Sequence, residues 1–544
     1  MKRVTISLAT LLSGFLGLSQ YAQAQGTYVD DALLFSRTGP SGTARSLGVG
    51  GAATALGGDF SSLSINPAGL GLFTKSEFTF SPGIGIGNST SRVQLNGAST
   101  GSSPLDQSAN SFHIASVGLV FASRRADNDQ SSDWRGGAFS LGFTRQADFN
   151  QAFRYQNQTD DGHSFFQFLR EPGGYSSPAS TGYQSALSGI RKQESTGNYV
   201  DLDGLAYGAY LTGINPVTTT NPYAQINRVA RTDANNNLVP VQQNEVLKTK
   251  GSLSQFDLGY GGNYRDRLYL GGAVGIVSLN RTRTSTFGET TEGEEDFHYD
   301  DYLKTTGTGI NARVGLIFRA ADALRLGASI QTPTYISLHD EYSTTLVVNP
   351  GYVPSGADNV LTTQPGLLDY SIVTPFRANG GIAALVSKYG FFTADVEYVG
   401  YSQARFGLNN DDGTLAKANG LAKSFYKNTI NVRTGLEVRL DAFRLRAGAA
   451  VYGNPYSQGT ANRRTDYVTG GLGYRGKTFF IDAAAVYSGR VFGTLFGILD
   501  DNLETNKFTD QYKPYTLATA TTASPAIDID AHRTTATITA GFLF

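Results

Sequence analysis

The chain has 544 residues, with 44 Lys and Arg against 45 Asp and Glu, a formal net charge of −1 and no cysteine. The balanced charge argues against a general nucleic-acid-binding protein, which usually carries a basic excess. The lack of cysteine excludes disulfides, thiolate metal sites, thiol nucleophiles and a cysteine-linked lipid anchor.

The first segment has the features of an export signal. Two basic residues precede an apolar stretch over 4–18, and Ala-Gln-Ala at 22–24 fits a small-x-small cleavage pattern. This order predicts a signal peptide over 1–24 and a mature chain that starts near Gln25. The alternative is a membrane anchor, but the apolar core is short and no other apolar run reaches about 18 residues.

A glycine-rich segment follows, and it contains "SLGVGGAATALGGDFSSLSINPAGLGLF" from Ser46 to Phe73. A dinucleotide-binding loop would follow a strand and open a helix, and no strand pattern precedes this run. We interpret it as compact backbone, in which an Asn66-Pro67 step favours extended or turn geometry at Asn66. The glycines expected to allow close approach and positive φ are Gly48, Gly50, Gly51, Gly57 and Gly58.

The rest of the chain alternates with the period of β-strands. Ile310, Val314 and Phe318 share one face, whereas Arg313 and Arg319 lie on the other. Fourteen strands are predicted, near 75–87, 110–123, 135–156, 251–265, 267–287, 303–319, 323–343, 367–386, 390–407, 427–440, 442–454, 465–475, 477–489 and 530–544.

From the fourth predicted strand onward, short turns such as "YRDR" and "SKYG" alternate with much longer links. This is typical of an outer-membrane barrel with periplasmic turns and extracellular loops. We therefore predict an all-β fold, a 14-stranded antiparallel transmembrane β-barrel over 75–544 in the outer membrane of a Gram-negative bacterium. A long extracellular insertion is expected at about 157–250, and an acidic loop is expected at 292–301. The sequence does not decide whether this loop binds divalent ions or is simply solvated.

The final strand "TATITAGFLF" ends at Phe544, which is typical of recognition by the barrel assembly machinery. Outer-membrane lipid and lipopolysaccharide are the other expected macromolecular surroundings, and no nucleic acid is expected.

The run "SGTARSLGVGGAATALGGDFSSLSINPAGLG", followed by "SEFTFSPGIGIG", resembles the N-terminal hatch of the FadL/TodX-type outer-membrane hydrocarbon and long-chain fatty acid transporter family. Similarity is greatest to its Bacteroidetes-like branch, in "LRLGASIQTPTYISLHDEY" and "FFTADVEYVGYSQARF" among other segments. The resemblance implies that a hatch at 25–74 plugs the barrel from inside the lumen. It also implies uptake of hydrophobic small molecules, such as long-chain fatty acids or aromatic hydrocarbons, by hatch movement and lateral release.

The same resemblance gives the hatch-gate role to Asn66, Pro67, Ala68 and Gly69. The family's wall opening lies at a kink in the third strand, and the residues of interest there are Gly136, Gly137, Gly142, Asp148 and Asn150. Pro82-Gly83 could equally interrupt the first strand, so the position of the opening is not decided by the sequence.

Two groups of side chains have both a functional and a structural interpretation. Phe165, Phe166, Phe168 and Leu169 could form a ligand landing site on an amphipathic helix, or could belong to a loop that packs on itself. The inward faces carry charges that could pair across the lumen and hold barrel and hatch together: Arg313, Arg319, Arg325, Asp395, Glu397, Arg433, Glu437, Arg439, Arg444 and Arg446.

Other functions remain as alternatives. No serine–histidine arrangement points to catalysis, so no enzyme, catalytic residue, cofactor or metal site is expected. The histidines are scattered, yet a haemin- or ligand-binding surface receptor would need His163, His298 or His339 as axial ligands. A general diffusion porin is the other alternative, although an apolar segment at 25–74 is better placed inside the lumen.

Overall fold

The computed structural model describes residues 31–95, 98–99, 104–126, 128–129, 131–158, 178–219, 222–228, 241–291, 294–407, 414–457, 464–489 and 526–544. The predicted signal peptide at 1–24 and the predicted landing residues Phe165, Phe166, Phe168 and Leu169 lie outside these ranges, as does His163.

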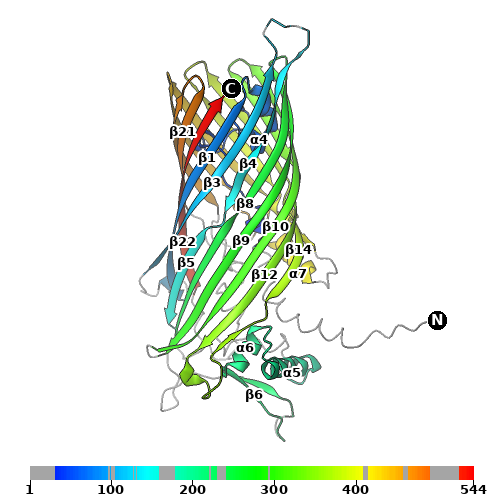
Figure 1. Cartoon of the computed structure of the whole chain (residues 1–544), viewed down its shortest axis with the longest axis vertical. Helices are drawn as coiled ribbons and strands as arrows, with labels where there is room; N and C mark the ends of the chain where they lie inside the picture. The colour runs from blue at the N-terminus through cyan, green and yellow to red at the C-terminus, as the bar shows by residue number, and fades with distance from the viewer. Residues whose placement is uncertain are drawn as a thin grey trace, which may run out of the picture.

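Fourteen antiparallel strands, some of them interrupted, close into a barrel (Figure 1). The first half of the wall consists of β1 (Glu77–Leu95), β3 (Leu105–Arg124), β4 (Trp134–Asp148) with β5 (Gln151–Gln158), β8 (Val241–Tyr264), β9 (Leu268–Thr291), β10 (Glu294–Ala321) and β11 (Leu324–Gln331) with β12 (Tyr335–Val348). The second half consists of β14 (Gly366–Val373) with β15 (Arg377–Val386), β16 (Gly390–Val399) with β17 (Arg405–Gly407), β18 (Thr429–Leu440), β19 (Phe443–Tyr452), β20 (Thr465–Arg475), β21 (Phe479–Gly489) and β22 (Ala526–Leu543).

The barrel closes where the first strand meets the last. β1 pairs with β22 from Glu77↔Leu543 to Gln94↔Ala526. Two short strands, β2 (Ala98–Ser99) and β13 (Val360–Thr362), pair antiparallel with the ends of β1 and β12, respectively. Closure leaves no free sheet edge at the seam, which a wall surrounded by lipid requires because hydrocarbon cannot satisfy backbone groups.

The wall has an apolar exterior and a polar interior, as the alternation predicts. Ile310, Val314 and Phe318 are 56%, 59% and 42% exposed on the outer face of β10, whereas Arg313 between them is 4% exposed. A barrel with this arrangement spans a membrane, because its outer face is a lipid-compatible band.

The two ends of the barrel differ as expected. At the end of the barrel where the C-terminus lies, the hairpin turns are tight (Figure 1). Four turn residues there have left-handed backbone: Arg265, Asp266, Ser387 and Asp441, with φ of 53°, 54°, 45° and 51°. Such conformations match the twist of two-residue hairpin turns. The opposite end carries α5 (Thr181–Thr196), α6 (Leu202–Gly208) and the hairpin of β6 (Thr212–Asn215) with β7 (Gln225–Arg228) (Figure 1).

The prediction of an acidic loop at 292–301 is wrong for most of that segment. Residues 294–301 belong to β10, and the β9–β10 ladder continues outward to Thr291↔Glu294. The reason is that Phe297 and Tyr299 alternate with the acidic residues and are buried, at 0% and 7% exposure, beneath the α6 region. Within the predicted insertion at 157–250, residues 241–250 continue the wall as part of β8.

Four predicted single strands are divided. Segment 135–156 is split into β4 and β5, at an interruption described with the site below. Segment 323–343 is broken before β12 by Thr332-Pro333-Thr334, and segment 367–386 is broken before β15 by Thr374-Pro375-Phe376. Proline has no N–H to donate to the ladder, which explains both interruptions. Segment 390–407 is broken by a 3₁₀ turn, η5 (Tyr401–Gln403). The remaining helical elements on connecting segments are η4 (Pro350–Tyr352) and α7 (Thr414–Phe425).

The described part of the N-terminal segment, 31–74, lies inside the lumen and is called the hatch below. It contains α3 (Ala44–Gly48), α4 (Ser62–Ile65) and the 3₁₀ helix η1 (Pro67–Leu72), and its first six residues are also helical. Gly50, Gly51, Gly57 and Gly58 all have positive φ, between 62° and 74°, as predicted for the turns between these short elements. The expectation of a positive φ is wrong for Gly48, because it is the last residue of α3 and has helical backbone. No described helix is both long and apolar enough to cross a bilayer.

Candidate functional site: the hatch and the third strand

Asn66 is the best-connected residue of the predicted gate motif. Its backbone is extended, at φ −148° and ψ 100°, as the following proline requires. Its side-chain Nδ2 donates to the carbonyl oxygen of Thr54 at 2.7 Å and to that of Leu316 on β10 at 3.1 Å. Its Oδ1 accepts from the N–H of Ala68 at 3.2 Å and caps η1. One buried side chain therefore joins two parts of the hatch to the barrel wall.

The next three gate residues pack without spare space. A Cβ on Gly271 of β9 would lie 2.3 Å from the carbonyl carbon of Pro67, so the wall must have glycine there. Ala68 is fully buried against Tyr269 and Ile317. A Cβ on Gly69 would lie 2.8 Å from the Cα of Gly57, so the predicted gate motif packs directly against the hatch turn at Gly57.

Phe60 is a hatch residue that the sequence interpretation missed. Its ring lies over Gly118 of β3 and Gly142 of β4, where an added Cβ would come within 2.1 Å and 2.6 Å of ring carbons. Gly118 and Gly142 are partners in the β3–β4 ladder. The signal that could have found Phe60 is that it is the only aromatic residue between the hatch glycines and the gate motif.

The β3–β4 ladder ends just beyond this contact. Its last pair is Ser116↔Thr144, after which a bulge falls between Arg145 and Ala147 and β4 stops at Asp148. β5 continues the chain but pairs only with β8. Within the described residues, the 105–115 part of β3 therefore pairs with β1 on one edge and has no ladder partner on the other.

Lumen-facing side chains hold the interrupted strand on the inside of the wall. Arg533 of β22 donates to Asp148 Oδ2 at 2.6 Å and to the carbonyl oxygen of Asn150 at 3.0 Å. Ser89 Oγ of β1 donates to the carbonyl oxygen of Ala152 at 2.6 Å. The start of β5 thus lies across the inner faces of β3 and β1 instead of continuing in the wall.

The structure also places the other residues considered for the opening. Gly136, Gly137 and Gly142 lie in the paired part of β4, so only Asp148 and Asn150 of that set border the interruption. Pro82 causes a register shift in β1, but β1 resumes pairing with both β3 and β22 on each side of it. The wall is therefore interrupted in the third strand.

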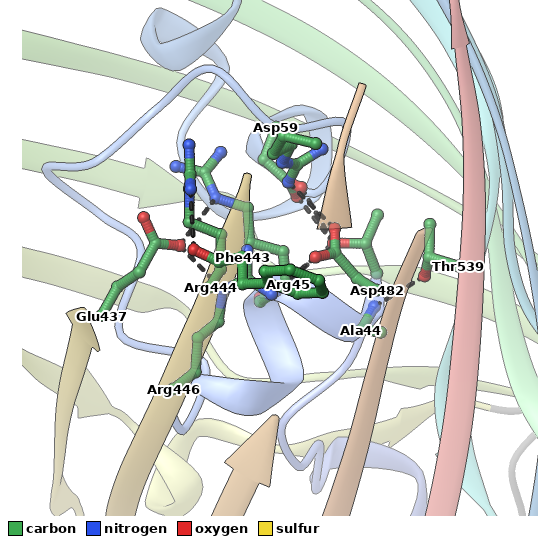
Figure 2. A network of polar contacts seen from close by, with 12 residues as sticks. Ala44, Arg45, Asp59, Glu437, Phe443, Arg444, Arg446, Asp482 and Thr539 are labelled. Carbon is green, nitrogen blue, oxygen red and sulfur yellow. Dashed lines mark hydrogen bonds and ion pairs between the residues drawn. The ribbon is translucent and has the colours of Figure 1, made fainter. Parts of the chain in front are cut away.

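A buried ion network holds α3 against the wall (Figure 2). Arg446 bridges Glu437 and Asp482, with N–O distances of 2.8 Å and 2.7 Å, and Arg45 of the hatch lies 3.9 Å from Glu437. Attraction to these acids raises the pKa of Arg45 despite the opposing effect of burial. Ala44 N–H donates to Thr539 Oγ1 at 2.8 Å in the same region.

Most of the other predicted inward charges also pair or contact the hatch backbone. Arg313 and Arg325 donate to the hatch carbonyls of Leu63 and Leu56 at 3.1 Å and 2.7 Å. Asp395 accepts from Thr54 N and Oγ1 at 2.9 Å and 2.7 Å. Three further ion pairs are Arg377–Glu397, Arg439–Glu437 and Arg319–Asp322. Arg433 donates to the side chain of Asn379, and Arg444 donates to backbone carbonyls of its own turn. These contacts support the interpretation that the charges hold the hatch in place.

The start of the hatch lies in an apolar region of the lumen. Leu33 and Phe35 pack with Phe149, Leu253 and many inward residues of β9, β12, β14, β16 and α7 in one buried cluster. Phe35 and Phe149 have ring centroids 6.0 Å apart, so the hatch start contacts the interrupted strand directly.

One buried ion pair fixes this end of the hatch. Asp31 pairs with Arg281 of β9, and both are 2% exposed. Burial raises the pKa of Asp31, and Arg281 and Arg283 offset this only in part.

Of the described histidines, His298 contacts Glu295 and His339 contacts Asp369, while His113 and His532 line one cavity between the hatch and the third strand. No group of three or more His, Cys, Asp or Glu with metal-ligand geometry occurs in the described ranges.

No protein-family model matches the chain, and no curated protein matches it. Among solved structures, it is similar to a Pseudomonas aeruginosa FadL homologue, with a TM-score of 0.52 at 12% identity, covering 93% of this chain and 99% of that chain. The P. putida toluene transporter TodX aligns with a TM-score of 0.46 at 12% identity, and the Ralstonia pickettii toluene transporter TbuX with 0.43 at 14%. Each of these covers 93% of this chain and 99% of the other. The chain is therefore an outer-membrane β-barrel with the FadL-type fold, fourteen strands closed around an N-terminal hatch.

Proposed function

We propose that the protein takes up hydrophobic small molecules, such as long-chain fatty acids or aromatic hydrocarbons, across the outer membrane. The ligand enters the apolar part of the lumen, the hatch shifts, and the ligand leaves sideways into the bilayer. The observation that carries this proposal is the loss of the β3–β4 ladder beyond Ser116↔Thr144, directly beside the hatch contact of Phe60.

The surfaces on both sides of the interruption suit an apolar ligand. Inside, Phe149 belongs to the apolar lumen cluster. Outside, the lipid-facing wall over β1 and β20–β22 has a groove of about 580 Å³, and Phe112 from the 105–115 part of β3 borders it. The groove is lined by Ile84, Phe112, Leu472 and Ile538 over a floor of glycine and alanine, and Phe112 is 77% exposed. A molecule that leaves between β3 and β5 would meet lipid-like surface at once, and would avoid the ion network around the hatch.

The same features bear on the alternatives. A general diffusion porin needs an open aqueous lumen, and here the hatch fills the cross-section with buried contacts. A haemin receptor needs an axial ligand beside an apolar slot. His298 and His339 instead pair with Glu295 and Asp369 on the long strands.

A reversible disulfide tests the requirement for hatch movement. The chain has no native cysteine, so an Ala44→Cys, Thr539→Cys pair introduces the only two thiols. Ala44 N and Thr539 Oγ1 are 2.8 Å apart, so the two positions adjoin, and formation of the disulfide is first checked by mass spectrometry. We expect cells expressing this variant to take up labelled oleate or toluene only after reduction.

Each single-cysteine variant is the matched control and should be insensitive to reductant. Equal uptake by the oxidised and reduced double variant would contradict hatch movement. Uptake no greater than that of cells lacking the protein would contradict hydrophobic transport itself.

A further inference from the structure

The outer face of β8 changes from apolar to basic toward the end of the barrel that carries α5 and α6 (Figure 1). Phe256, which is 43% exposed, is the last large apolar residue of this face before the change, and two serines follow it. The next two residues on the same face are Lys250 and Lys248, and both are exposed. One strand therefore presents two adjacent ammonium groups on the outside of the wall.

Strand register places two further cations beside them. Lys250 pairs with Thr282 of β9, and Thr282 pairs on its other side with Lys304 of β10. Because neighbouring strands lie about 4.8 Å apart, the Cα atoms of the two lysines are about 10 Å apart. Arg154 of β5 is exposed, and its pairing makes it a diagonal neighbour of Lys248. These four cations, Arg154, Lys248, Lys250 and Lys304, are called the outer basic patch below.

The outer basic patch carries more positive than negative charge. Glu341 of β12 lies opposite Lys304 in the ladder, and Asp300 lies four residues away from Lys304 along β10 on the same face. Lys248 and Lys250 have only threonines opposite them on β9. Within the described residues, neither of these two ammonium groups has a hydrogen-bond or ion-pair partner. The uncompensated charge is therefore concentrated on β8.

The height of the patch limits what can reach it. Phe256 pairs with Ile276 of β9, which pairs with Ile310 of β10, and all three are exposed, so the apolar band ends near this row. Lys250 lies six residues beyond Phe256. This is about 20 Å along the strand at about 3.4 Å per residue, or about 16 Å in height at a tilt of about 40°. Flexible lysine stems extend back toward the membrane from there, so the ammonium groups meet the polar layer just outside the hydrocarbon.

We propose that the outer basic patch binds lipopolysaccharide of the outer leaflet, through the phosphates and acidic sugars next to its lipid anchor. The barrel lies in the outer membrane, where this lipid supplies the anionic groups at that height. Ammonium and guanidinium groups form charge-assisted hydrogen bonds with phosphate and carboxylate oxygens. Thr282 and Thr284 lie between the cations and add hydroxyl donors. The inference concerns the membrane-facing wall and does not depend on what the lumen transports.

Binding of purified lipopolysaccharide tests the patch. The full-length barrel in detergent micelles is titrated with labelled rough lipopolysaccharide, which has the lipid anchor and only the inner sugars. Lys248→Gln, Lys250→Gln should weaken binding about tenfold to thirtyfold, because each cation near an anionic lipid surface contributes about a factor of five. Lys248→Arg, Lys250→Arg keeps both charges and should bind within about twofold of wild type.

Lys388→Gln, Lys477→Gln is the matched control. It removes the same charge from exposed lysines on hairpin turns at the opposite end of the barrel, and should bind normally. Folding is checked for every variant by the faster migration of unheated barrels in gels.

Three results would overturn the proposal. The first is an equal loss of binding in both glutamine variants, or no loss in either. The second is loss of wild-type binding in EDTA, which would mean that divalent ions bridge the lipid to the acids of the wall. The third is displacement by millimolar inorganic phosphate, which would indicate a site for free anions.

Discussion

The side-chain amide of Asn66 donates to the main-chain carbonyl of Leu316 on β10, at 3.1 Å, and so binds the hatch gate to a membrane-spanning strand. The space for this contact exists because position 315 is glycine, where a Cβ would lie 1.9 Å from Asn66 Oδ1. The predicted gate motif thus packs closely against β10, and the two form one complementary surface.

Removing the Asn66 side chain should loosen this surface. Asn66→Ala loses the η1 cap, worth about 1 kcal/mol, and leaves buried carbonyls unpaired at about 1–3 kcal/mol each. We expect labelled oleate uptake to fall several-fold while the barrel still inserts. Ser64→Ala, which removes a half-buried hatch hydroxyl, is the matched control. Uptake equal to wild type in Asn66→Ala would exclude a gate role.

Phe60 should couple the hatch to the last pairs of the β3–β4 ladder. Phe60→Ala empties a buried site and should cost about 3–5 kcal/mol of hatch packing. We expect faster amide hydrogen exchange in the β3–β4 pairs around Gly118↔Gly142, with unchanged exchange in β18–β19. Unchanged exchange at both places would show that the ring does not support the opening.

Glu437 should anchor α3 through its ion network. Glu437→Gln removes the carboxylate that lies 3.9 Å from Arg45 and leaves Arg446 paired with Asp482 alone. Loss of one member of a buried pair costs about 3–5 kcal/mol. Urea unfolding in micelles, followed by the single tryptophan, Trp134, measures this loss. Asp322→Asn is the control, because Asp322 is 96% exposed and its pair with Arg319 should contribute little. Equal midpoints for both variants would refute the anchor.

Asp31 should make the start of the hatch pH-dependent. Its carboxyl lies near Arg281 and Arg283 of β9 and near Asp340 of β12, and burial raises its pKa above the usual 3.8. A raised pKa means that the carboxyl's stabilising contribution is full below the unfolded pKa and is lost as pH rises through the folded pKa. Hydrogen-exchange protection of residues 31–36 should therefore decrease from acidic to neutral pH. Asp31→Asn should remove this trend, and an increase of protection with pH would contradict it.

The barrel could be predicted from the sequence because most strands repeat the same two-residue alternation. Ile310 and Arg313 show the rule, and the structure keeps them on opposite faces. The errors fall where aromatic residues continue the alternation inside an apparently acidic loop, as Phe297 and Tyr299 do. Charge content indicated a loop there, but buried aromatic rings extended the strand.

The site was only partly predictable, because its contacts join residues far apart in the chain. The resemblance pointed to Asn66, and the pattern of glycines indicated tight turns. Nothing local to Phe60 indicates that its ring lies against Gly118 and Gly142, and nothing near Arg533 indicates that it binds Asp148. Such contacts depend on how the closed barrel brings its strands together, and periodicity carries no information about them.

The length of β10 sets how far the barrel wall extends beyond the membrane, and so where a ligand would first contact the protein. Its 28 residues extend about 95 Å at about 3.4 Å per residue, or about 70 Å along the barrel axis at a tilt of about 40°. An apolar band of about 25 Å accounts for little more than a third of that height. The end of the wall that carries α5 and α6 therefore extends about 40 Å beyond the hydrocarbon. Under the proposed uptake function, a ligand captured at this end would reach the membrane depth inside the barrel, without crossing the polar surface layer outside it.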